Sequence, residues 1–104
     1  MKSKIVYSED IKPGDIIREV TSSGTELARY LVIDRFFEED IIGDEEKRTI
    51  TYFESVLIYV NSIGDGAIWY RTTKPGASYA ISEFELGKRN RFEWTFRSPL
   101  SWSA

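Results

Sequence analysis

Hydrophobic and polar residues alternate along most of this chain with a period of two rather than three or four. The clearest case is the segment 91–97, in which Phe92, Trp94 and Phe96 fall on one face. Such alternation is typical of an antiparallel strand with one face buried and one in water. We therefore expect these three aromatic side chains to be buried and the charged and polar residues between them to face solvent.

Five further segments are rich in the β-branched and aromatic residues that suit a pleated surface. They predict strands at Lys4–Tyr7, Asp15–Thr21, Ala28–Phe36, Thr49–Val60 and Ala67–Thr73. Glycine and proline turn signals separate the segments at intervals of about ten residues, which favours a small barrel or sandwich. The pattern therefore predicts an all-β fold.

Two short segments depart from the strand pattern. Residues 82–86 can form one helical turn, with Ser82 as its N-cap and Phe84 directed inward. Near the end of the chain Pro99 stops strand pairing, and Trp102 is too large and apolar to be left in water without cost. We expect this tail to fold back and cover one end of the barrel.

Composition restricts the architecture to one domain. A chain of 104 residues with 41% hydrophobic and 14% aromatic residues fills one modest core, so residues 1–104 are expected to form a single domain. The first residues lead into a polar segment without an apolar run, so we expect no signal peptide and no membrane contact. The cytoplasm is the expected location.

The chain contains no histidine and no cysteine. It therefore lacks the side chain that titrates near neutral pH, the usual zinc and copper ligands, and the thiolate nucleophile. No other residues fall into a recognisable catalytic spacing, so we expect no enzymatic activity and no cofactor. The competing enzyme hypothesis needs a pair of groups in a cleft, such as Asp34 with Glu54 or a lysine with a tyrosine.

An acidic segment, residues 38–46, places six carboxylates in nine positions. Clusters of oxygen ligands bind calcium or magnesium, but here the regular ligand alternation around a loop glycine is missing and Ile41 and Ile42 interrupt the cluster. We expect a solvated hairpin tip and no metal. The functional alternative is an acidic surface for a basic partner, with Ile41 and Ile42 as an apolar anchor.

A basic turn lies at residues 88–91, where Lys88, Arg89 and Arg91 adjoin aromatic residues. Cations beside stacking rings are typical of proteins that bind single-stranded nucleic acid. The aromatic residues alternate with polar ones, however, which places them more simply in the core beneath the turn. The net charge of −3 also opposes binding to a polyanion, so nucleic acid is the less favoured partner.

The aromatic residues Trp69 and Tyr70 are adjacent in sequence, so in a strand they point to opposite faces and one of them is expected to be exposed. Aromatic side chains contribute strongly to binding because they bury much area with few rotatable bonds. Trp69 or Tyr70 is therefore the first candidate for contact with a protein partner. Packing at an edge strand is the structural alternative.

A resemblance supports this picture. Ile11-Lys12-Pro13-Gly14-Asp15-Ile16-Ile17, followed by Arg29-Tyr30-Leu31-Val32-Ile33, resembles the opening hairpin of SH3-like small β-barrels. Ile81-Ser82-Glu83-Phe84 and the final aromatic strand are similar to the helical turn and closing strand of small barrel proteins of bacteria and phages. The resemblance implies a single, partly open barrel of about five to seven antiparallel strands.

Such barrels serve as binding modules, so the resemblance implies a protein partner first and nucleic acid second. The leading hypothesis is therefore a non-enzymatic module that contacts a protein through an exposed aromatic or acidic surface. A nucleic-acid-binding barrel using residues 88–91 is one alternative. A structural or self-associating subunit, paired through a sheet edge across a twofold axis, is another, and the pattern leaves the oligomeric state open.

Overall fold

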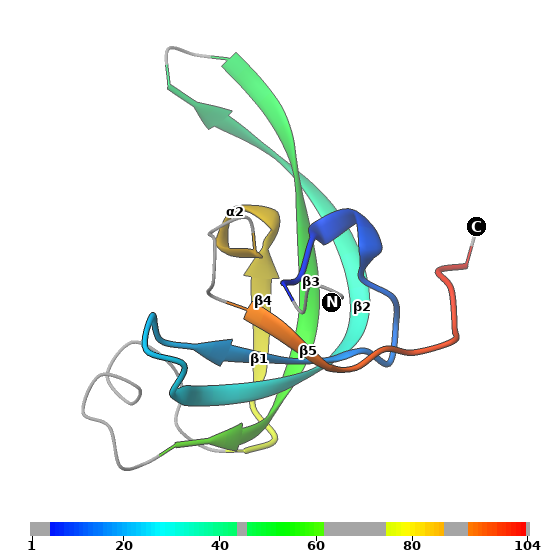
Figure 1. The fold of residues 1–104 in the computed structure, drawn as a ribbon. Helices are drawn as coiled ribbons and strands as arrows, with labels where there is room; N and C mark the ends of the chain where they lie inside the picture. The colour runs from blue at the N-terminus through cyan, green and yellow to red at the C-terminus, as the bar shows by residue number, and fades with distance from the viewer. Residues whose placement is uncertain (1–4, 44–45, 62–74, 87–91, 104) are drawn as a thin grey trace.

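A computed structural model of the protein describes residues 5–43, 46–61, 75–86 and 92–103. Its elements are η1 (Ser8–Asp10), β1 (Ile16–Val20), β2 (Glu26–Ile42), β3 (Glu46–Val60), β4 (Ser78–Ser82), α2 (Glu83–Leu86) and β5 (Phe92–Phe96). The strands form one five-stranded antiparallel sheet in the order β4-β3-β2-β1-β5 (Figure 1). The predicted all-β class is confirmed, with η1 as a helical turn that was not expected.

The topology is a meander from β1 to β4, after which the chain returns to place β5 beside β1. In Figure 1, β1 and β5 run across the direction of β3 and β4, so the sheet turns strongly between its two edges. Those edges are β4 and β5, and no described strand joins them, so the described sheet is not closed.

The two central strands are longer than predicted. β2 continues beyond Phe36 to Ile42, and β3 begins at Glu46 rather than Thr49. The acidic segment continues the ladder because its residues find compatible partners across the strands, as in the pair Asp40↔Arg48. At the turn, Gly43 has φ 66, a conformation that a residue with a Cβ rarely adopts.

Two other strand predictions need correction. Instead of a strand at Lys4–Tyr7, the described residues there form one isolated bridge, Ile5↔Glu93, followed by η1. β4 was missed, because its short sequence contains serine and alanine, which carry little strand signal. The predicted strand at Ala67–Thr73 lies outside the described residues.

The core lies on the concave side of the sheet, between the strands, α2 and the N-terminal segment. Its buried members are Val6, Ile11, Ile17, Ala28, Tyr30, Val32, Phe53, Leu57, Ile81, Leu86 and Phe92. A buried carboxylate, Glu19, shares this side of β1 with Ile17 and accepts a hydrogen bond of 3.2 Å from the Tyr30 hydroxyl. This bond partly compensates the cost of removing both polar groups from water.

The burial of β5 differs from the prediction. Phe92 is 1% exposed and Trp94 is half-buried, but Phe96 is 52% exposed. The register explains the difference, because Ile17 pairs with Trp94 while its neighbour Ile16 pairs with Phe96, so one residue of β5 is unmatched at a bulge. The alternation that begins at Phe92 therefore does not keep its relation to the core at the end of the strand.

The predicted helical turn is confirmed as α2, and the Ser82 hydroxyl accepts a hydrogen bond of 3.3 Å from the backbone N–H of Glu85. The predicted inward residue was wrong. Phe84 is 44% exposed, whereas Leu86 is buried in the core. Neither of the described helical segments has the length and apolar character needed to cross a bilayer.

The buried carboxylate of Asp15, the residue directly before β1, joins three parts of the chain. Asp15 accepts hydrogen bonds from the backbone N–H of Lys12 at 2.9 Å and the Trp94 indole at 3.0 Å, and another from the backbone N–H of Ser98. The preceding Gly14 has φ 91, and a Cβ there would lie 3.0 Å from the Ser98 hydroxyl. The bonds of Asp15 and the small size of Gly14 thus favour the close approach of the C-terminal segment to β1.

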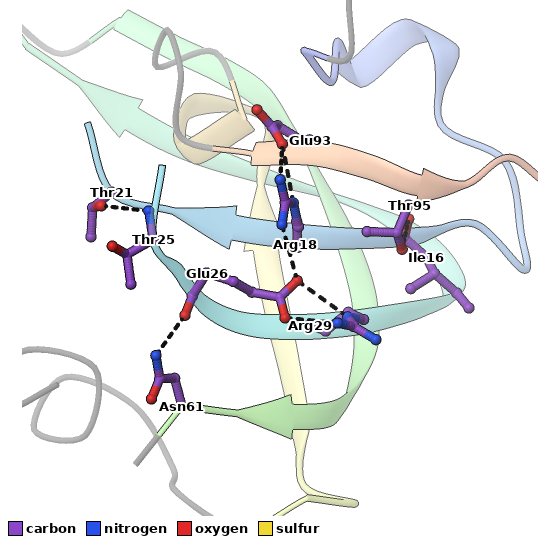
Figure 2. A network of polar contacts seen from close by, with 9 residues as sticks. All are labelled: Ile16, Arg18, Thr21, Thr25, Glu26, Arg29, Asn61, Glu93 and Thr95. Atoms are coloured by element: carbon purple, nitrogen blue, oxygen red, sulfur yellow. Dashed lines mark hydrogen bonds and ion pairs between the residues drawn. The ribbon is translucent and has the colours of Figure 1, made fainter. Parts of the chain in front are cut away.

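On the convex face, charged side chains form a row across the strands (Figure 2). Arg18 on β1 donates to Glu93 on β5 at 2.6 Å and lies 3.6 Å from Glu26 on β2, which also pairs with Arg29 at 2.7 Å. The hydrogen bond to Glu93, together with the charges of Glu93 and Glu26, raises the pKa of Arg18 above its ordinary value. The row therefore ties β5, β1 and β2 together on the side opposite the core.

The unequal burial of Phe92 and Phe96 on β5 leads to a prediction about stability. Phe92→Ala is expected to lower the free energy of unfolding by about 3 to 5 kcal/mol, because it leaves a cavity in the core. Phe96→Ala is expected to cost less than about 1 kcal/mol, because that ring is largely in water already. Denaturant melts of the two variants measure the difference, and equal losses would contradict the observed register.

A second prediction concerns Asp15. Asp15→Ala removes the acceptor of three donors and is expected to cost more than about 3 kcal/mol of unfolding free energy, since each buried donor left unpaired is expensive. Asp10→Ala, an exposed acidic control at the end of η1, is expected to change stability by less than about 0.5 kcal/mol. Urea unfolding monitored by tryptophan fluorescence provides the test, and a mild effect of Asp15→Ala would exclude this residue as a structural anchor.

Candidate protein-binding surface

The far ends of β2 and β3 form a two-stranded arm, which we define as residues 36–43 and 46–52. β1 accompanies β2 only as far as the pair Ile16↔Leu31, and β4 accompanies β3 only from the pair Tyr52↔Ser82 onward. Beyond these pairs the two strands continue together to Ile42↔Glu46. In Figure 1 the arm rises above the remainder of the sheet.

The base of the arm is fixed to the body of the protein. Phe36 and Tyr52 stack across the two strands with ring centroids 5.3 Å apart and an interplanar angle of 9°. The backbone N–H of Thr51 donates to the Glu83 carboxylate on α2 at 3.2 Å, and Ile50 is buried. Because an isolated two-stranded ribbon is only marginally stable in water, these contacts explain how the arm persists.

One face of the arm carries exposed apolar side chains. Phe37 and Ile41 are 58% and 59% exposed, and they lie on the same face because side chains on a strand alternate. Their spacing of four residues places them roughly 13 Å apart along the strand. Glu39 lies between them, so the face presents two apolar groups with a carboxylate at its centre.

The C-terminal segment meets this face at its base. The Arg35 guanidinium lies 5.4 Å from the centre of the Phe37 ring and 4.8 Å from that of Trp102. Trp102 packs against the core beside Phe53 and donates its indole N–H to the carbonyl of Ile11 at 2.9 Å. The predicted folding back of the tail is therefore confirmed, and it supports the base of the exposed face.

The negative charge of the protein is concentrated in residues 38–48, which include the end of β2 and the start of β3. Residues 38–48 contain six acidic and two basic residues, whereas the whole chain has a net charge of only −3. All described charged side chains of this segment are exposed. The remainder of the chain is therefore close to neutral, and residues 38–48 are the main source of negative charge.

The arrangement of these carboxylates does not form a cation cage. Glu38 and Asp40 lie on one face of the arm and Glu39 on the other, whereas calcium requires oxygen ligands that converge on one point. In the part of the chain that the structure describes, no group of three or more metal-ligating side chains is close enough to hold a metal ion. The arm is instead a dispersed acidic surface.

The residues proposed from sequence are located only in part. Ile41 is exposed near the tip of the arm, and Ile42 is described through its backbone alone, where it pairs with Glu46. The aromatic candidates Trp69 and Tyr70 lie outside the described residues. The same holds for the basic candidates Lys88, Arg89 and Arg91.

The structure brings together the carboxylate pair on which the enzyme hypothesis depends. Asp34 and Glu54 are direct neighbours across β2 and β3, on the face opposite the buried Phe53 and Ser55. Asp34 is exposed, and its carboxylate accepts a hydrogen bond from the next backbone N–H, that of Arg35, at 2.8 Å. The two carboxylates are therefore cross-strand neighbours, of which Asp34 is exposed and Glu54 is half-buried.

Two hydrogen bonds between a tyrosine and a glutamate lie on the core side of the sheet, and sequence reasoning did not find them. Tyr30, which is bonded to Glu19, has its ring centroid 5.9 Å from that of Tyr79, and the Tyr79 hydroxyl lies 3.1 Å from the Glu85 carboxylate. The two tyrosines thus each hydrogen-bond a glutamate near the core. These pairs satisfy polar groups that the packing of β1, β2, β4 and α2 brings together.

Sequence reasoning also missed the most exposed apolar residue at the base of the arm, Phe37. The predicted strand ended at Phe36, so Phe37 was assigned to no face. The signal that could have identified it is the alternation Phe37, Glu39, Ile41, which continues the strand through the acidic segment.

In comparisons with known proteins, no family model matches the chain, and no curated protein and no solved structure is detectably similar to it.

Proposed function

We propose that this protein is a non-enzymatic binding module that contacts a basic protein partner through the β2–β3 arm. The observation that carries the proposal is the exposure of Phe37 and Ile41 on one face of a strongly acidic ribbon. Apolar residues surrounded by charged ones resemble the centre and rim of a protein interface. The acidic residues favour a basic partner and accelerate its association.

We further propose that the domain is SH3-like. Four strands in meander order, a short helical turn and a final strand beside β1 support this assignment. The cytoplasm remains the proposed location. Fold likeness alone does not identify a ligand, so the proposed function rests on the arm rather than on the architecture.

Nucleic acid is the weaker candidate partner. Affinity for a phosphate backbone comes mainly from cations that displace counterions, and the arm has an excess of carboxylates. The cations of the alternative, Lys88, Arg89 and Arg91, are too few to overcome a negative net charge at physiological salt. We therefore expect no measurable binding to random oligonucleotides under those conditions.

The proposal predicts a specific pattern of substitution effects. After the partner is retained on the immobilised protein, identified and purified, Phe37→Ala and Ile41→Ala are each expected to weaken binding by more than about 1 kcal/mol. Ile58→Ala, another partly exposed aliphatic residue on β3 but away from the arm, is expected to have no effect. Isothermal titration calorimetry measures the affinities, and thermal melts are expected to be unchanged for all three variants.

The opposite pattern would overturn the proposal. If Lys88→Ala and Arg89→Ala abolish binding while Phe37→Ala and Ile41→Ala have no effect, the basic turn is the interface and the nucleic-acid alternative takes its place. An oligonucleotide that binds with steep salt dependence would lead to the same conclusion.

A further inference from the structure

The backbone N–H and C=O groups of β2 in the arm point alternately toward β3 and away from it. In an antiparallel pair, residues alternate between those that bond the partner strand and those whose N–H and C=O groups point away from it. The N–H groups of Arg35 and Ile41 donate to the side chains of the preceding Asp34 and Asp40, each at 2.8 Å. These donors therefore point away from β3.

A hydrogen bond on β3 supports this assignment. Thr51 is the residue opposite Phe37, and its N–H donates sideways to Glu83 on α2 rather than to β2. The pair Phe37↔Thr51 therefore belongs to the set that points outward. Along β2 the outward set then consists of Arg35, Phe37, Glu39 and Ile41.

No strand of the described part of the chain lies beside the outer edge of β2 at these residues. Coverage by the segment that leads into β1 ends at Val32, which exchanges hydrogen bonds of 2.8 and 2.9 Å with Gly14 and Asp15. Among the described residues, none pairs with the outer side of β2 beyond that point. The result is an open edge bounded by two aspartate-capped donors, Arg35 N–H and Ile41 N–H.

Phe37 and Glu39 lie between the two capped positions. No described side chain accepts a hydrogen bond from either backbone N–H, and both residues are exposed. Capping the ends of an exposed edge limits nonspecific strand pairing, whereas the uncapped centre can still receive a strand. The edge is thus open over one short, defined stretch.

We propose that an extended basic segment of the protein partner adds to the sheet as a strand along the β2 edge, from Arg35 to Ile41. This inference rests on the proposed function of the arm and specifies its binding mode. Main-chain hydrogen bonds to Phe37 and Glu39 provide the affinity, and the side chains that alternate along the segment provide the specificity.

The two faces of the arm indicate the chemistry of that segment. Glu38 and Asp40 lie on one face, so they favour lysine or arginine at the neighbouring positions of the added strand. Phe37 and Ile41 lie on the other face, so they favour apolar residues at the intervening positions. A segment in which cationic and apolar residues alternate satisfies both faces at once.

A second copy of this chain is a poor occupant of the same edge. Antiparallel pairing of β2 with its own copy would bring Glu38, Glu39 and Asp40 close to the same carboxylates of the other chain. Like charges directly across a sheet are destabilising. Charge complementarity therefore favours a basic segment over self-association.

Binding of a synthetic peptide tests the mode. The probe is a fluorescein-labelled peptide of alternating lysine and valine, about eight residues long to match a strand. Its controls are a peptide of the same composition with the lysines and valines in separate blocks, an alternating glutamate and valine peptide, and the first peptide N-methylated at every residue. Fluorescence anisotropy at low salt is expected to show binding of the alternating basic peptide and at least about tenfold weaker binding of every control.

Variants of one edge residue provide the matched test. Glu39→Pro removes the central outward N–H and obstructs the edge without removing a bond to β3, so it is expected to weaken peptide binding by about tenfold. Glu39→Gln keeps the N–H and is expected to weaken binding by no more than about threefold, since it removes one exposed charge. Circular dichroism verifies that both variants fold.

Hydrogen exchange measured by NMR makes the test independent of the proline variant. Addition of the alternating basic peptide to the unmodified protein is expected to slow the exchange of the Phe37 and Glu39 amides. Equal binding of the N-methylated peptide, no added protection of these amides, or dimerisation of the free protein through this edge would overturn strand addition. If the N-methylated peptide binds equally well while Phe37→Ala and Ile41→Ala still weaken binding of the native partner, strand addition is wrong but the arm remains the interface. If those two variants do not affect binding of the native partner, the proposed function itself is overturned.

Discussion

The fold depends on a buried carboxylate at the start of β1. Strand β5 must return across most of the chain length to pair with β1, and such distant pairing carries a large cost in chain entropy. Asp15 compensates part of that cost by accepting hydrogen bonds from Trp94 on β5 and from the backbone of Ser98 just after it. One side chain thereby fixes where β5 lies and where the C-terminal segment leaves the sheet.

The local character of the fold could be predicted from sequence, but its registers could not. Period-two alternation identified β1, β2, β3 and β5, and a serine N-cap identified α2. The exposure of Phe96 depends on a bulge between β1 and β5, and that of Phe84 on how α2 packs. Both are set by residues distant in sequence, about which a local pattern carries no information.

The candidate surface likewise combines features that local sequence predicts with features that depend on tertiary contacts. The acidic composition of the arm and the exposure of Ile41 follow from local sequence, because a charged hairpin end has little reason to be buried. The importance of Phe37 did not follow, since it required knowing that β2 continues without β1 beside it. The contact between Arg35 and Trp102 required the return of the C-terminal segment, which is again a tertiary event.

The Arg35 guanidinium contacts two rings at once, one on the arm and one on the C-terminal segment. Cation–π contacts of this kind depend steeply on the position of the cation, so movement of the arm changes the electrostatic environment of the Trp102 indole. The emission of the Trp102 indole is therefore expected to change when the base of the arm is displaced or when Arg35 is replaced.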